Sequence, residues 1–146
     1  MKYQLGKLCL ALGLMFLLEA GSGYAQAYYG LTAEVPFAFT AGNSNLESGR
    51  FFIKEVNSSM NIVNITSQEG KGSIILIAGG TMVENSSNSH PRLVFNKYGD
   101  RYFLSKIWYG NAGMGCQLTH TKAEKEAAQS AVSMNEKVSV IEIAGR

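Results

Sequence analysis

The stretch LVFNKYGDRYFLSKIW, residues 93–108, decides the fold, because two runs rich in apolar and aromatic residues flank Gly99-Asp100. Glycine at the first central position suits a type II′ turn of two residues, since glycine tolerates a positive φ angle. The sequence therefore predicts an antiparallel hairpin in which Phe95 lies opposite Leu104.

Side chains alternate between the two faces of such a hairpin. We expect one face to belong to the core and the other to be only partly covered. The expected core face carries Leu93, Phe95, Tyr102, Leu104 and Trp108. The expected outer face carries Val94, Tyr98, Phe103 and Ile107 among polar residues. A slip of one residue in the register would exchange the two faces.

Strand signals extend over much of the remaining chain. Val35, Phe37 and Phe39 alternate in residues 31–41, and Pro36 favours an edge strand because proline cannot donate to a ladder. The Gly-, Asn- and Ser-rich residues 41–49 predict a loop. Further strands are expected at residues 49–56, 60–67 and 137–144.

Residues 74–78 read IILIA and are apolar at every position. Such a run is typical of a strand that is covered on both faces. If this run or the Pro36 strand were left uncovered, its edge would be a surface for pairing with another chain.

One helix is expected near the C-terminus. Thr121 and Glu124 fit a capping box, and residues 123–131 contain strong helix formers with a stripe of alanines. The predicted fold is therefore mainly β, a small antiparallel barrel or sandwich of about seven strands with one short helix.

The N-terminal residues have the three parts of a secretory signal peptide. Residues 1–7 carry Lys2 and Lys7, residues 8–18 are an unbroken apolar run, and a small-residue site ends at Ala27. We expect cleavage between Ala27 and Tyr28, which divides the chain into a signal peptide, 1–27, and a single β-rich domain, 28–146. The alternative is a buried N-terminal helix. Export to the periplasm or the extracellular space follows from the first interpretation, with no transmembrane segment in the mature chain.

Several segments together resemble a known family. They are VPFxF at residues 35–39, LVFxxYGDRYFLSxIW at residues 93–108, GxxL at residues 115–118 and AExE at residues 123–126. This pattern is similar to that of a family of small uncharacterised exported bacterial proteins. The resemblance implies export and a common fold, and it brings no activity, ligand or catalytic residue with it. The family more often has charged residues where this chain has Cys116 and Gln117.

Few residues of this sequence are candidates for a catalytic or metal-binding role. Cys116 and His120 could form a nucleophilic pair only if the intervening residues were helical, and the glycines of residues 110–115 favour a loop. Three widely spaced His and Cys side chains do not supply a structural zinc site, and we expect no metal and no cofactor. The net charge of +2 is not concentrated in a basic tract, so no nucleic-acid partner is expected.

The hairpin offers one candidate binding surface, because amphipathic aromatic residues and arginine are favoured at contact sites. Its residues are Tyr98, Asp100, Arg101, Tyr102 and Trp108. The competing interpretation is that Tyr102 and Trp108 are ordinary core residues.

The leading hypothesis for the function of the chain is an exported, non-enzymatic binding or structural module. The alternatives are an enzyme that uses Cys116 with His120 and a self-assembling component of the cell envelope.

Overall fold

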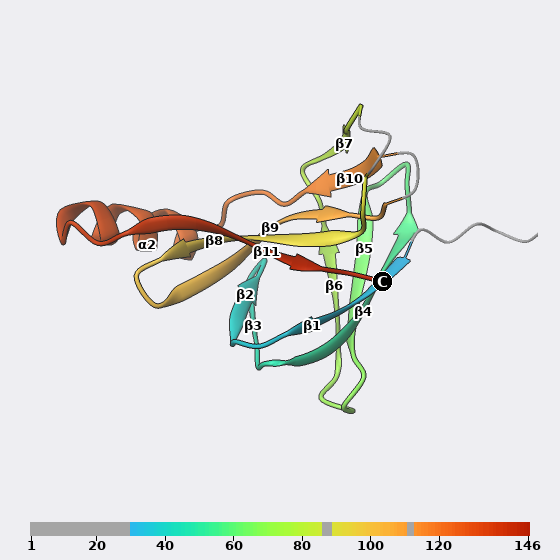
Figure 1. Cartoon of the computed structure of the whole chain (residues 1–146), viewed down its shortest axis with the longest axis horizontal. Coiled ribbons are helices and arrows are strands. Elements are labelled where there is room, and N and C mark those ends of the chain that lie inside the picture. The colour runs from blue at the N-terminus through green and yellow to red at the C-terminus, as the bar shows by residue number, and fades with distance from the viewer. Residues whose placement is uncertain (1–29, 86–88, 111–112) are drawn as a thin grey trace, which may run out of the picture.

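The computed structural model describes residues 30–85, 89–110 and 113–146 (Figure 1). The predicted signal peptide and its cleavage site lie outside the described residues. The described residues form eleven strands and one helix, which confirms a mainly β fold of the sandwich type with a helix near the C-terminus. The expectation of about seven strands is too low, because short strands form in segments whose glycines predicted loops.

The first sheet contains four antiparallel strands in the order β1-β4-β5-β6. Their bounds are β1 Gly30–Val35, β4 Gly49–Asn57, β5 Ile62–Ser67 and β6 Ser73–Ile77. The predicted edge position is confirmed, since β1 stands at one end of this sheet. The expected strand over residues 31–41 is interrupted, however, because β1 ends before Pro36 and residues 39–41 pair in the other sheet.

The second sheet contains seven strands, of which five follow the order β11-β8-β9-β10-β7. Their bounds are β7 Gly80–Val83, β8 Arg92–Tyr98, β9 Arg101–Trp108, β10 Met114–Gln117 and β11 Val138–Ala144. A small hairpin of β2 Phe39–Ala41 and β3 Ser44–Leu46 supplies the other two strands, because β2 pairs in parallel with β9. The predicted loop at residues 41–49 is therefore wrong over β3, and β10 occupies glycine-rich residues that also favoured a loop.

The core lies between the two sheets. In Figure 1, β4, β5 and β6 run steeply across the direction of β8, β9 and β11, which is the orthogonal form of sheet packing. Two backbone hydrogen bonds between Thr32 and Arg146 join β1 to the chain that leaves β11, so the sheets meet at this corner. The largest fully buried side chains are Phe95, Phe103, Leu31, Ile53, Ile65, Leu93, Ile107, Val35 and Val63.

The β8–β9 hairpin has the predicted turn and the predicted register at its tip. Gly99 has a φ of 57°, as the first position of a type II′ turn requires, and Phe95 pairs with Leu104. Beyond that pair the register shifts, so that Val94 pairs with Lys106 and Ser105 is an extra residue in β9. The carbonyl of Ser105 accepts a hydrogen bond of 2.8 Å from the Leu118 amide.

This bulge reverses two face assignments. Ile107, expected on the outer face, is fully buried among the core residues. Trp108, expected on the core face, is buried as predicted, but it lies on the outer face and outside the main core cluster. The outer face is also better covered than expected, because Phe103 is only 2% exposed. Tyr102 packs against the core, as the alternation predicted.

Helix α2, Lys122–Ser133, covers part of that outer face and lies beside β8 in Figure 1. Thr121 caps it, because the Thr121 hydroxyl accepts a hydrogen bond of 3.2 Å from the Glu124 amide. Of the expected alanine stripe, Ala127 and Ala131 are buried and Ala123 is exposed. No helix in the described part of the chain has the length and apolar character that a membrane crossing requires.

Candidate functional site

Strand β6 was predicted to be covered on both faces, and the structure shows that this is wrong. It stands at the end of the first sheet, with β5 as its paired neighbour. Ile74 and Leu76 pack against the core, whereas Ile75 and Ile77 are 68% and 76% exposed on the outer face. The all-apolar run does not distinguish these cases, because only the sheet order determines whether a second layer covers it.

Apolar residues continue from β6 over the adjacent end of the sheet. Ile77 pairs across the strands with Ile62 of β5, which is half-buried. Val56 at the β4 bulge and Met60 in the β4–β5 turn are 48% and 64% exposed. We call this group, with Ile75, the β6 apolar edge.

Three other strands at sheet ends, β1, β7 and β11, have features that discourage pairing with another chain. β1 carries Glu34 and is followed by Pro36, and β11 carries Glu142. β7 is only four residues long. Charged residues, proline and short length are common means of protecting an edge, and β6 has neither a charge nor a proline within its five residues.

The five residues of the predicted hairpin surface lie at different places. Tyr98 and Arg101 form a cross-strand pair at the tip of the hairpin, next to the exposed Asp100. Tyr102 points to the opposite side and stacks on Phe37, with ring centroids 3.9 Å apart. Trp108 lies at the far end of β9. The structure thus brings together only the three residues at the tip.

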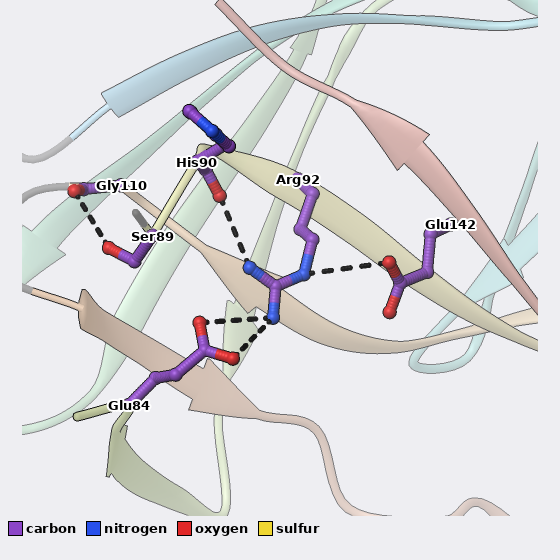
Figure 2. A network of polar contacts seen from close by, with 6 residues as sticks. All are labelled: Glu84, Ser89, His90, Arg92, Gly110 and Glu142. Carbon is purple, nitrogen blue, oxygen red and sulfur yellow. Dashed lines mark hydrogen bonds and ion pairs between the residues drawn. The ribbon is translucent and has the colours of Figure 1, made fainter. Parts of the chain in front are cut away.

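A polar network surrounds Arg92, which the sequence did not single out (Figure 2). Nη2 of Arg92 lies 3.1 and 3.2 Å from the two carboxylate oxygens of Glu84, and Nε lies 3.7 Å from Glu142. The guanidinium carbon lies 4.9 Å from the centre of the Trp108 ring. This one side chain thereby connects the segment after β7 with β9 and β11, so we interpret the network as structural.

Cys116 and His120 are not brought together. Cys116 lies in β10 and is 3% exposed, and its Sγ is 3.6 Å from the hydroxyl of Tyr109. Burial is the main reason that the pKa of the Cys116 thiol is raised to about 11, and the nearby Glu55 adds to the effect. A thiol with a raised pKa is a weak nucleophile at neutral pH.

His120 belongs to a different cluster, which is centred on the buried Glu124. Oε1 of Glu124 lies 3.1 Å from Nδ1 of His120 and accepts a hydrogen bond of 2.9 Å from Nδ2 of Asn96. Burial raises the pKa of Tyr98, and the adjacent Glu124 carboxylate raises it further. The capping box predicted that Glu124 would bond back to the helix start, but its carboxylate bonds across to β8.

Sequence reasoning could not have found this cluster, because Asn96 and Glu124 are far apart in the chain and Glu124 resembles any solvated helix residue. Within the described residues, no group of three or more His, Cys, Asp and Glu side chains is placed to hold a metal ion.

Comparison with protein-family models, with curated proteins and with solved structures finds no match to this chain. The resemblance to small exported bacterial proteins therefore stays a prediction that rests on the motifs quoted above.

Proposed function

We propose that this chain is an exported, non-enzymatic β module that associates with further copies of itself through the β6 apolar edge. The observation that carries the proposal is the exposure of Ile75 and Ile77 on an uncharged strand at a sheet end. An edge strand presents unpaired backbone donors and acceptors to a partner strand, and its side chains add apolar contact.

The composition of β6 favours a second copy as the partner. An antiparallel pairing of two β6 strands centred on Ile75 places Ile75 opposite its own equivalent and Ile74 opposite Leu76. Ser73 would lie opposite Ile77. No charged residue faces another in this arrangement, because Ser73–Ile77 contains none. The outer face of the joined sheet would then carry a continuous apolar stripe that includes Ile77 of both copies.

The absence of an enzymatic role is part of the proposal. It is supported by the raised pKa of the Cys116 thiol and by the engagement of Nδ1 of His120 with Glu124. These are the two residues that the alternative enzymatic hypothesis requires.

The association is tested by light scattering of the exported chain over a wide concentration range. We expect the molar mass to rise with concentration. The Ile75→Lys variant should remain a monomer, because the charge would be buried beside its own equivalent. Val140→Lys on β11 is the matched control, since Val140 is also an exposed β-branched residue at a sheet end and is 62% exposed.

At a concentration low enough for the parent chain to be a monomer, both variants should keep its melting temperature, because each changes an exposed side chain. A parent chain that is monomeric at every concentration would contradict the proposal. So would an equal loss of association in the Val140→Lys control.

Export is tested separately, by N-terminal sequencing of the chain recovered from the envelope fraction of an expressing bacterium. The proposal expects the sequence to begin at Tyr28. A chain that still begins at Met1 would contradict export while leaving the association result unaffected.

A further inference from the structure

A pocket of about 410 Å³ lies on the second sheet, and its lining includes Gly79 and Gly80, which follow β6 in the chain. It is formed by β7, the end of β10, the residues that follow β10 and the first turns of α2. Pockets that bind small molecules commonly have volumes of roughly 300–1,000 Å³. Met82 and Leu118 provide an apolar part of the lining, and Gln117 and Thr119 provide polar groups.

Two basic side chains, His120 and Lys125, line this pocket, and no carboxylate does. Among the residues that the structure describes, Lys125 has no ion pair, whereas the neighbouring Lys122 is paired with Glu126 at 3.8 Å. No carboxylate of the described residues forms an ion pair with the Lys125 ammonium, so this group lacks a paired counter-charge. A ligand with a negative charge would supply it.

Glu124 holds the His120 ring in place from behind. Its side chain is only 6% exposed, and Oε1 lies 3.1 Å from Nδ1 of His120. The same oxygen is bound by Asn96, so the carboxylate is itself fixed. A ring that donates its Nδ1 hydrogen to Glu124 has a fixed orientation, and in the neutral imidazole Nε2 is then a hydrogen-bond acceptor. His120 therefore forms a fixed wall of the pocket, and Lys125 supplies the group that can bind an anion.

We infer that this pocket binds a small organic carboxylate, whose anionic group is bound by the Lys125 ammonium and whose apolar part lies against Met82 and Leu118. The single unpaired ammonium matches the single charge of a carboxylate. The apolar residues match an organic group, which inorganic anions lack.

The inference is tested by titrating the isotopically labelled chain with benzoate and recording backbone amide resonances by NMR. Saturable shifts are expected at Thr119, His120 and Lys125. Benzyl alcohol is the neutral control ligand, and it should bind at least about tenfold more weakly, because it cannot form the charge-assisted contacts.

Lys125→Met should weaken benzoate binding about tenfold, since it removes the charge and keeps most of the side-chain length. Lys122→Met is the matched control on the same helix and should leave the affinity unchanged. Equal affinities for benzoate and benzyl alcohol would overturn the inference. It would also be overturned if benzoate produced no saturable shifts, or if Lys122→Met weakened binding as much as Lys125→Met.

Discussion

Leu93 of β8 pairs with Ile107 of β9, and this pairing places Ile107 on the core face of the hairpin. It depends on the extra residue Ser105, because without the bulge Ile107 would lie on the outer face. The carbonyl of Ser105 is bonded by the Leu118 amide, so the bulge also fixes the chain that follows β10. The packing of the core and the position of the pocket are therefore connected through one irregularity in β9.

Replacement of Ile107 by alanine should lower the free energy of unfolding by about 2–5 kcal/mol, because Ile107 is fully buried and its removal leaves a cavity. Lys106→Ala is the control, and it should cost less than about 1 kcal/mol since Lys106 is only half-buried. Urea denaturation followed by circular dichroism measures both values. Equal costs for the two variants would show that the register of β9 is not the one described.

The turn of this hairpin could be predicted from the sequence, and its bulge could not. A glycine between two strand-like runs is typical of a tight turn, so the residues next to Gly99 were sufficient to predict the tip of the hairpin. Ser105 carries no such signal, because the bulge is stabilised by Leu118, which is distant in the sequence. The alternation of apolar and polar residues along one strand does not indicate tertiary contacts of this kind.

The surroundings of β6 and of Glu124 also depend on segments that are distant in the sequence. An all-apolar run predicts burial, but the sheet order leaves Ile75 and Ile77 without a covering layer. The capping motif correctly predicted the helix start at Thr121, because a cap is a local structure. The carboxylate of Glu124 instead accepts a hydrogen bond from Asn96 on β8, and no residue spacing within the helix could indicate this contact.

The Arg92 network should contribute measurably to stability. Arg92→Lys is expected to lower the free energy of unfolding by about 1–2 kcal/mol, because lysine cannot bond to Glu84 and Glu142 while stacking on Trp108. Arg101→Lys is a suitable control, since Arg101 also stacks on a ring, that of Phe103, but is exposed. Thermal unfolding of both variants should show a lower midpoint only for Arg92→Lys, and similar midpoints would refute a structural role for the network.

Cys116 should react slowly with iodoacetamide at neutral pH, because burial disfavours its thiolate. The same shift makes stability depend on pH. The pKa of the thiol is 9.0 ordinarily and about 11 in the fold, so its contribution is fully present below pH 9 and is lost as the pH rises toward 11. The loss should be on the order of 2–3 kcal/mol.

Cys116→Ala should therefore lose less stability between pH 9 and pH 11 than the parent chain. Some loss will remain in the variant, because burial also raises the pKa of Tyr109. Denaturation series at each pH measure the difference between the two chains. Rapid labelling of the folded chain, or identical pH profiles for the two chains, would disagree with an inert, buried thiol.

The central claim is that β6 is an open edge at which copies of the chain pair. Hydrogen–deuterium exchange measured at low and at high protein concentration tests it most directly, since a new strand protects the backbone amides that it bonds. We expect residues 73–77 to exchange more slowly at high concentration, while residues 138–144 of β11 exchange at the same rate throughout. Exchange at residues 73–77 that does not depend on concentration would contradict the claim.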